Sequence, residues 1–443
     1  MMIGKHRLKC CRIYLTMIDF YLICFKEEKK VDTCKEMKQI SCAKEKTKIL
    51  IAMPYIQFGG VESTLFSLLN ELNPDEFIVT LVLLQKDTSD LSRIPNWISV
   101  EEIPIPEKEM GVFYGRKKML KSYIKKGNLF RIPRFLLYNA RFQQSEDRVA
   151  EAAYYDRIAD SIVENPYDYD VAIDYFGYAT FTTFYVAEKV NARLKISWIH
   201  SVLSRYAPYP FLKWYEKMDK IYAVSYKAKE DFECMFPKLN NVQVFHNIIK
   251  PEKIRALADD NEKYEDGFDG IRILTVGRIC EEKGTDIAAN VYRRLVNDGH
   301  HIRWYIMGDG SKEEKKRVLS LLENEQQKEN FVYMGRRTNP YPYMKQCDIY
   351  VQPSRFEGYC TATNEARILG CPIVMTDVSG AKEQIQDGVT GRVVGIDECE
   401  LYKAIDDLIC NPEKRQMFRN NLKLVDCGTE NEITEIKRVL RNS

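Results

Sequence analysis

The sequence predicts an α/β protein made of two doubly wound domains in tandem, each a parallel sheet covered by helices. From Thr47 onward, short apolar runs alternate with segments of helical spacing, as expected where buried strands are separated by helices. The alternation stops once, at the acidic segment Asp259–Gly270, and then restarts, which is typical of a domain junction. Two such sheets facing each other would leave a cleft beyond the carboxyl ends of their strands.

The first domain is expected to contain six buried strands. Each is a short apolar run bounded by polar or turn-forming residues. We place them at Lys48–Met53, Phe77–Leu84, Val171–Asp174, Lys195–Ile199, Ile221–Val224 and Val242–Phe245. The segment Val61–Leu72, after the first of these strands, has helical spacing.

The second domain repeats the pattern with six more strands. We place them at Ile271–Val276, Ile302–Met307, Phe331–Tyr333, Ile349–Gln352, Pro372–Met375 and Arg392–Val394. Helices are expected at Lys312–Gln326, Thr361–Leu369, Glu398–Leu408, Pro412–Leu422 and Glu430–Leu440. The domain boundaries that follow are 47–255, 256–427 and a C-terminal helix in 428–443 that could return to the first domain.

Residues 1–46 are interpreted as a poorly specified N-terminal extension. Their most apolar stretch, Cys10–Phe25, is interrupted by polar residues and is shorter than the ~20 residues that a spanning helix needs. No small-residue cleavage site follows it. A membrane anchor is the alternative, and translation could instead start at Met37, since the first clear strand begins only at Thr47.

The composition is that of a globular protein in a reducing compartment. Apolar residues make up 45% and charged residues 29%, which is enough to fill sizeable cores, and the net charge of +2 does not favour nucleic-acid binding. The 13 cysteines include no Cys-x-x-Cys pair, which argues against a disulfide framework or a zinc knuckle. We therefore expect reduced thiols and a cytoplasmic location.

The most specific motif is S-R-F-E-G-Y-C-T-A-T-N-E-A, from Ser354 to Ala366. Glu357 follows a strand, Gly358 permits close backbone approach, and a helix begins near Thr361 with Glu365 in its first turns. The free amides at a helix start suit a phosphate, and carboxylates accept hydrogen bonds from sugar hydroxyls. The motif therefore fits a nucleotide-sugar, although Glu365 could simply cap the helix and Glu357 could be solvated.

Two further loops carry related signals. V-G-R-I-C-E-E-K-G-T-D, from Val276 to Asp286, places Arg278 and Lys283 between a strand and a helix, where fixed cations could bind a diphosphate leaving group. An ordinary surface loop is the alternative. P-Y-I-Q-F-G-G-V-E contains the pair Gly59–Gly60, which is a weak signal because any tight turn uses glycine. Neither phosphate-binding fingerprint of ATPases or nicotinamide enzymes is present.

With these motifs and a W-I-H segment, the chain resembles retaining glycosyltransferase family 4 (glycosyl transferases group 1), whose fold is GT-B. The marks are E-x7-E at Glu357 and Glu365, G-R…K-G at Arg278 to Gly284, G-G at Gly59 and Gly60, and W-I-H at Trp198 to His200. They occur in family order, each on a strand-end loop, and the resemblance covers Thr47 to Leu424.

The resemblance implies a role for each of these residues. The catalytic candidates are Glu357, Arg278, Lys283 and His200: the two cations would bind the donor diphosphate, Glu357 would hold the transferred sugar, and His200 would lie near it. The donor-binding candidates are Gly59, Gly60, Gly358, Tyr359, Cys360, Thr361 and Glu365, the last on the nucleotide ribose. Gly308 is a further candidate, because the segment M-G-D-G (Met307–Gly310) is expected to form a turn near the nucleotide base or, alternatively, a plain turn. Tyr359 and Cys360 stand where relatives vary, so the identity of the sugar does not carry over. A lone histidine is by default structural, which is the alternative for His200.

The implied reaction is transfer of a sugar, with retention, from a nucleotide-sugar (a UDP-sugar is expected) to a glycan or lipid-linked glycan. The first domain would bind the acceptor and the second the donor, with no metal and no cofactor besides the co-substrate. Assembly of a surface polysaccharide is the expected pathway. The alternatives are a nucleotide-sugar epimerase or phosphorylase of similar shape, and a non-catalytic glycosyltransferase-like partner subunit.

Two more segments bear on membrane contact and on metal binding. The segment Gly111–Gln144 has nine Lys or Arg, no acid, and interleaved aromatics, which indicates contact with the inner face of a membrane or, alternatively, a solvated helical face. Its candidate contact residues are Arg116, Lys117, Lys118, Lys121, Lys125 and Lys126. Asp168-Tyr169-Asp170 resembles a metal-binding D-x-D, but it is expected to precede a strand instead of following one, so we expect no metal there.

Overall fold

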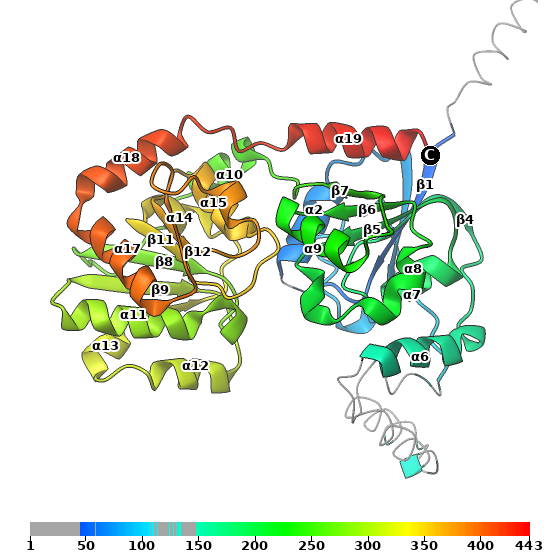
Figure 1. The fold of residues 1–443 in the computed structure, drawn as a ribbon, viewed down its shortest axis with the longest axis horizontal. Helices are drawn as coiled ribbons and strands as arrows, with labels where there is room; N and C mark the ends of the chain where they lie inside the picture. The colour runs from blue at the N-terminus through cyan, green and yellow to red at the C-terminus, as the bar shows by residue number, and fades with distance from the viewer. Residues whose placement is uncertain are drawn as a thin grey trace, which may run out of the picture. The chain divides into compact units, whose positions relative to one another are not determined.

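The structure is a computed structural model that describes residues 45–57, 59–107 and 148–443, together with isolated positions between 109 and 133 (Figure 1). The chain divides into two units, Met1–Lys46 and Thr47–Ser443, and all that follows concerns the second. The stretch Cys10–Phe25 and the candidate membrane-contact residues Arg116, Lys117, Lys118, Lys121, Lys125 and Lys126 lie outside the described residues. No described helix is long and apolar enough to cross a bilayer.

The first sheet has seven parallel strands in the order β3-β2-β1-β4-β5-β6-β7. They are β1 (Thr47–Met53), β2 (Phe77–Leu83), β3 (Ser99–Glu102), β4 (Asp168–Asp174), β5 (Asn191–Ile199), β6 (Lys220–Ala223) and β7 (Val242–Val244). Six of them were predicted. The seventh, β3, was missed because an edge strand reading S-V-E-E has no buried apolar run to mark it.

The second sheet has six parallel strands in the order β10-β9-β8-β11-β12-β13. They are β8 (Ile271–Val276), β9 (Ile302–Met307), β10 (Phe331–Gly335), β11 (Ile349–Gln352), β12 (Ile373–Thr376) and β13 (Arg392–Val394), and all six predictions are confirmed. In each sheet the order reverses beside the first strand, between β1 and β4 and between β8 and β11. These reversals are the switch points at which doubly wound sheets bind ligands.

Helices connect the strands in both sheets. The first sheet carries α2 (Gly60–Leu69), α6 (Arg148–Ile158), α7 (Phe181–Lys189), α8 (Leu212–Tyr215) and α9 (Tyr226–Met235). After these come α10 (Pro251–Ala258), α11 (Thr285–Asn297), α12 (Lys312–Leu319), α13 (Glu325–Asn330), α14 (Tyr341–Gln346), α15 (Thr361–Ile368), α16 (Ala381–Gln384), α17 (Glu398–Cys410), α18 (Pro412–Leu422) and α19 (Glu430–Arg441).

The expectation of one helix over Lys312–Gln326 is wrong, because α12 ends at Leu319 and α13 starts at Glu325. The side chain of Asn324 accepts a hydrogen bond from the Gln327 amide and so caps a new helix. Leu322, in the turn between the two helices, is buried in the core. The apolar spacing across this turn therefore belonged to two helices.

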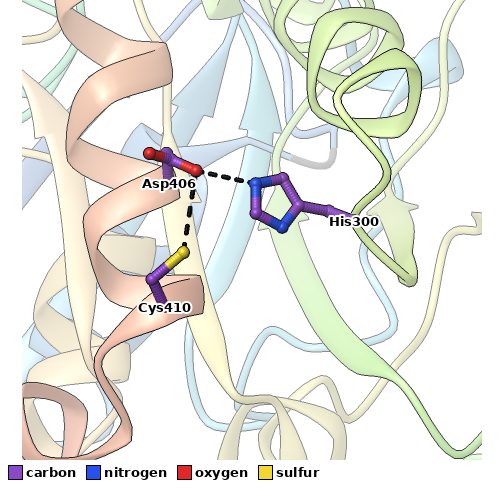
Figure 2. Close-up of side chains that lie close together, drawn as sticks. All are labelled: His300, Asp406 and Cys410. Atoms are coloured by element: carbon purple, nitrogen blue, oxygen red, sulfur yellow. Dashed lines mark hydrogen bonds and ion pairs between the residues drawn. The ribbon is translucent and has the colours of Figure 1, made fainter.

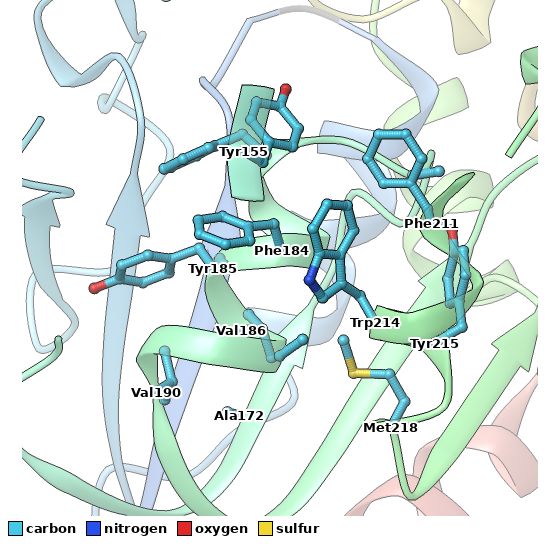
Figure 3. Packing of buried hydrophobic residues seen from close by; sticks show 14 of the residues in the cluster. Tyr155, Ala172, Phe184, Tyr185, Val186, Val190, Phe211, Trp214, Tyr215 and Met218 are labelled. Atoms are coloured by element: carbon cyan, nitrogen blue, oxygen red, sulfur yellow. The ribbon is translucent and has the colours of Figure 1, made fainter. Parts of the chain in front are cut away.

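Both faces of the first sheet are buried, which explains the unbroken apolar strands. Along β1, Leu50 and Ala52 belong to one apolar cluster, whereas Ile49, Ile51 and Met53 belong to another on the opposite face. The first cluster is rich in aromatic rings, with those of Tyr155, Phe184, Phe211 and Tyr215 gathered around Trp214 (Figure 3). The second cluster also contains Ile433, Ile436, Val439 and Leu440 of α19. The C-terminal helix therefore packs against the first sheet.

The acids of Asp168-Tyr169-Asp170 lie within β4, so the expectation that they precede a strand is wrong. Asp168 accepts a hydrogen bond from the Asn191 side chain at 2.7 Å, and Asp170 accepts one from the Lys48 amide at 2.8 Å. The two carboxylates thus bind neighbouring strands at the amino end of β4. This end is opposite to the switch-point loops.

Candidate functional site

Lys283 and Glu357 form the charged centre of the second sheet's switch point. Lys283 lies in a short 3-10 turn (Glu281–Lys283) after β8, and Glu357 lies in the loop after β11. The Nζ of Lys283 donates to both carboxylate oxygens of Glu357 at 2.7 Å, and the Glu357 side chain is only 8% exposed. Burial works against the charged ammonium, but the Glu357 carboxylate outweighs it, so the pKa of Lys283 is raised. Lys283 is therefore a fixed cation, and the alternative of a solvated Glu357 is wrong.

A buried chain of hydrogen bonds orients Glu357. The hydroxyl of Ser354 donates to the Oε1 of Glu357 at 2.7 Å, and the Nε2 of Gln352 donates to the hydroxyl of Ser354 at 2.8 Å. The hydroxyl of Tyr350 in turn donates to the Oε1 of Gln352 at 2.7 Å. Tyr350 and Gln352 are two residues apart on β11, and therefore point to the same face of the sheet. Such a chain holds a carboxylate in one orientation before any ligand arrives.

Glu282 joins a cation from each half of the protein. Its Oε2 accepts from the Nη2 of Arg278 at 2.9 Å, and its Oε1 lies 2.9 Å from the Nη2 of Arg205. Arg205 belongs to the 3-10 turn Leu203–Tyr206, which follows β5 of the first sheet. Its guanidinium also lies 3.8 Å from the centre of the Phe356 ring, beside Glu357 in the sequence. Sequence reasoning missed Arg205, which stands in no recognisable pattern. It also gave no role to Phe356, although this residue lies within the motif Ser354–Ala366.

Predicted glycines lie where loops of the two sheets meet. A Cβ added to Gly358 would lie 1.8 Å from the carbonyl oxygen of His200, so no larger residue fits without a backbone shift. A Cβ on Gly60 would lie 3.8 Å from the hydroxyl oxygen of Thr361. The loops after β1 and β5 are thus brought onto the loop after β11.

Two helix starts lie close together at this meeting point. Gly60 begins α2 and Thr361 begins α15, and neither Gly59 nor Cys360, the residue before each helix, caps it with a side-chain hydrogen bond. The carboxylate of Glu365 accepts from the Tyr341 hydroxyl instead of the first amides of α15, so the alternative in which Glu365 caps this helix is wrong. Uncapped helix starts present free N–H groups and a partial positive charge, which favour an anion. With Lys283 and Arg278 nearby, the site can hold a diphosphate.

Glu365 lies on α15, one turn after Thr361. Its Oε1 accepts a hydrogen bond from the hydroxyl of Tyr341 at 3.1 Å. Burial raises the pKa of this carboxyl to about 7, and the Tyr341 hydrogen bond opposes the rise. The group thus titrates near neutral pH, where it changes between a donor and an acceptor of hydrogen bonds.

His200 is neutral and held by the backbone. Its Nε2 lies 2.8 Å from the carbonyl oxygen of Tyr175, which can only accept, so this nitrogen carries the proton. Burial lowers the pKa of His200 to about 4. The ring therefore carries no charge at neutral pH. Through its own carbonyl, His200 also contacts Gly358.

Sequence reasoning also missed Glu62 and Tyr178. Glu62, in the first turn of α2, is buried, and burial raises the pKa of its carboxyl while the charge of Arg278 opposes the rise. Burial also raises the pKa of Tyr178, in the loop after β4, and the charges of Glu357, Glu62 and Glu282 add to the rise. Tyr178 is thus close to acids from both halves. An acid at a helical position that is otherwise apolar was the available signal for Glu62.

The remaining donor-binding candidates contact other parts of the protein. Gly308 has φ +155°, and a Cβ there would lie 1.8 Å from the Gly277 carbonyl oxygen, so the turn after β9 packs on the turn after β8. Cys360 is buried, which raises the pKa of its thiol to about 12, and its carbonyl accepts from the Nε2 of Gln384 at 2.8 Å. The ring of Tyr359 lies 5.3 Å from that of His246.

The family comparison covers the second half of the chain. Residues 255–425 match the family model described as "Glycosyl transferases group 1", and this range includes Arg278, Lys283, Glu357 and Glu365. A curated relative, the N-acetylgalactosamine-N,N'-diacetylbacillosaminyl-diphospho-undecaprenol 4-alpha-N-acetylgalactosaminyltransferase of Campylobacter jejuni, is 29% identical over 47% of this chain and 56% of its own length. The capsular polysaccharide biosynthesis glycosyltransferase CapM of Staphylococcus aureus is 26% identical over 40% of this chain and 47% of its own length. The chain thus spans about half the length of these relatives.

Solved structures match across both sheets. HepE of Anabaena in complex with UDP-glucose superposes with a TM-score of 0.62 at 15% identity, over 89% of this chain and 100% of that one. A TarM variant of S. aureus, in complex with fondaparinux, α-GlcNAc-glycerol and UDP, gives a TM-score of 0.62 at 14% identity, over 90% and 100%. At these identities the likeness concerns the fold alone. The two parallel sheets have the GT-B arrangement of Rossmann-like domains.

Proposed function

We propose that the protein is a glycosyltransferase, which moves a sugar from a nucleotide-sugar to a glycan or a lipid-linked glycan in the assembly of a surface polysaccharide. The observation that carries the proposal is the Lys283–Glu357 pair at the switch point of the second sheet. It combines a fixed cation for a phosphate with an oriented carboxylate for a sugar. The activities of the relatives, on a diphospho-undecaprenol acceptor in one case and in capsular polysaccharide biosynthesis in the other, support the proposed acceptor and pathway.

The diphosphate of the donor would bind between Lys283, Arg278 and the uncapped start of α15. Lys283 and Arg278 now pair with Glu357 and Glu282, and a diphosphate would compete with these carboxylates for them. Once Lys283 turns to the phosphate, Glu357 is left to accept hydrogen bonds from the sugar. As the bond between the sugar and the diphosphate breaks, negative charge develops on the diphosphate, and the positive side chains beside it stabilise that charge. These residues would supply that charge without a metal.

The finer points of the reaction are part of the same proposal. A UDP-sugar is the proposed donor, because HepE was solved with UDP-glucose and the TarM variant with UDP. Transfer with retention is supported by the E-x7-E pattern at Glu357 and Glu365, and by the α-linkage that the C. jejuni relative forms. In this scheme Glu365 binds the nucleotide ribose. His200, which is neutral and bound to the Tyr175 carbonyl, positions the loop against Gly358.

The first test is thermal unfolding of the full-length chain with a panel of nucleotide-sugars. A true donor at about 100 times its dissociation constant should stabilise the fold by ~2.7 kcal/mol. The same stabilisation should be lost in Lys283→Ala and kept in Glu281→Gln, which removes an exposed acid from the same turn. If no nucleotide-sugar shifts the transition, the proposal fails.

The second test separates the reaction from its alternatives. The donor found by unfolding is incubated with and without a lipid-linked glycan, and products are identified by mass spectrometry. Transfer requires both substrates and should disappear in Glu357→Gln. Conversion of the donor with no acceptor present would identify an epimerase. Unimpaired polysaccharide assembly in cells that carry Glu357→Gln would identify a non-catalytic subunit.

A further inference from the structure

Three side chains of the kinds that bind transition metals gather between α17 and the segment that follows α11 (Figure 2). Asp406 and Cys410 are four residues apart on α17 and so share one face of the helix. His300 comes from the segment between α11 and β9. One ring nitrogen of His300, one carboxylate oxygen of Asp406 and the Sγ of Cys410 lie within 4.8 Å of one another. No other such group occurs in the part of the chain that the structure describes.

One oxygen of Asp406 faces both partners. The Nε2 of His300 lies 2.7 Å from the Oδ1 of Asp406, and the Sγ of Cys410 lies 3.9 Å from the same oxygen. The backbone of His300 is fixed because its amide donates to the carbonyl of Leu295 in α11 at 3.2 Å. α17 is equally fixed, since Leu401 and Ile405 lie in the core cluster that contains Leu295. The three ligand atoms thus stand on two packed elements.

A hydrogen bond between His300 and Asp406 explains two of the three residues without any metal. The neighbouring carboxylate offers a useful contrast. Asp407 pairs with Lys414 at 2.5 Å and with Arg392 at 3.8 Å. Among the described residues, no Lys or Arg lies within ion-pair distance of Asp406. Its carboxylate contacts the imidazole of His300 and the thiol of Cys410 instead. A cation bound at this oxygen would neutralise it.

We propose that His300, Asp406 and Cys410 bind a divalent transition metal of the zinc class, with water as the fourth ligand. Imidazole, carboxylate and thiolate are the ligands that zinc takes, in a tetrahedron with bonds of about 2.0–2.3 Å. Ligand atoms in such a site lie about 3.3–3.6 Å apart. Metal binding would therefore lengthen the distance between the Nε2 of His300 and the Oδ1 of Asp406, and would bring the Sγ of Cys410 closer to that oxygen. Cys410 is exposed and can make this movement. The ion ties α17 to the end of α11, away from the residues proposed to bind the donor.

The test is titration of the tag-free, full-length chain with cobalt(II), which stands in for zinc and absorbs visibly. A thiolate bound to cobalt adds a near-ultraviolet charge-transfer band. In the unmodified chain we expect that band to saturate at one equivalent of cobalt. Zinc added afterwards should displace the cobalt and remove the band. Cys410→Ser should remove the band. Asp406→Asn should lower cobalt affinity by at least about 10- to 100-fold, because the loss of a group that only hydrogen-bonds to a metal ligand already has an effect of that size.

Cys399→Ser is the matched control, because Cys399 is an exposed cysteine at the other end of the same helix. It should leave the band and the affinity unchanged. A band that persists in Cys410→Ser, or one lost in Cys399→Ser, overturns the proposal, as does the absence of any band in the unmodified chain. Unfolding midpoints measured without metal show whether each variant is folded. The result does not depend on nucleotide-sugar binding.

Discussion

Arg205 and Glu282 form an ion pair of 2.9 Å that connects the loop after β5 with the loop after β8. Glu282 binds Arg278 with its other oxygen, so the two arginines share one carboxylate. Arg278 is one of the two cations proposed to bind the diphosphate. Any change in the pair with Arg205 should therefore alter how firmly Glu282 holds Arg278.

Substitutions at these two positions should have opposite effects on the donor. Arg205→Ala leaves Glu282 to Arg278 alone, which should weaken donor binding by up to about fivefold, the upper value of about 1 kcal/mol for an exposed ion pair. Glu282→Gln frees Arg278 and should strengthen binding by a similar factor. Isothermal titration with the nucleotide-sugar measures both. Effects of the same sign in the two variants would contradict the shared-carboxylate account.

The hydrogen-bond chain behind Glu357 yields a graded prediction. Ser354→Ala removes a bond to the carboxylate and leaves the Nε2 of Gln352 without its acceptor in a buried place. A hydrogen bond to a charged group contributes about 1.5–3 kcal/mol, so kcat/KM should fall about 10- to 100-fold. Tyr350→Phe acts one bond further away and should cost less. Steady-state kinetics over donor concentration, with unfolding curves as the control, gives the order, and a larger loss in Tyr350→Phe would contradict it.

The carboxyl ends of parallel strands explain how the centre of this site could be predicted from sequence. Lys283 and Glu357 are 74 residues apart, but each follows a strand of the second sheet, and β8 and β11 are neighbours. Strand-end motifs on adjacent parallel strands must meet at one edge of the sheet. The buried strands themselves were predictable because both faces of each sheet are covered.

Contacts between the two sheets' loops could not be predicted in this way. Arg205 reaches Glu282 and Phe356 only because a 3-10 turn after β5 meets the loops after β8 and β11. Nothing in the local sequence around Arg205 signals that meeting. Gly358 was expected to permit close approach of a ligand, and the structure adds a contact with the His200 carbonyl that the sequence did not signal. Both features depend on packing between segments far apart in the chain.

The raised pKa of Glu365 predicts a pH-dependent stability. Its carboxyl has a pKa of about 7 in the fold against 4.5 ordinarily, so its contribution to stability is fully present below pH 4.5 and is lost as the pH rises through 7. Glu365→Gln, which needs no ionisation, should therefore be more stable than the unmodified chain at pH 8, by about 1–2 kcal/mol after allowing for partial exposure. Urea unfolding at pH 5 and pH 8 checks this. An equal difference at both pH values would contradict it.

The same group should make donor binding pH-dependent. If Glu365 binds the ribose as a carboxylate, donor affinity should rise between pH 6 and pH 8 in the unmodified chain and stay flat in Glu365→Gln. Tyr341→Phe removes the hydrogen bond that holds the pKa down, so the rise should move to higher pH. Titration calorimetry at several pH values measures the midpoint. A pH profile that is identical in all three proteins would show that the ionisation of Glu365 does not affect donor binding, which would contradict the prediction.

The raised pKa of His246 predicts that the fold loses stability at alkaline pH. Its Nδ1 lies 3.0 Å from Glu432 of α19, and its Nε2 lies 3.5 Å from Glu383 of α16, so the imidazolium bridges the two acids. The carboxylates of Glu383 and Glu432 together raise the pKa of His246 to about 9 against 6.5 ordinarily. Its stabilisation is thus fully present below pH 6.5 and is lost as the pH rises through 9, and is on the order of 2–3 kcal/mol. His246→Gln should remove most of the fall in unfolding free energy between pH 6.5 and pH 9.5, measured in urea. His301→Gln, at an exposed histidine, is the control that should keep that fall.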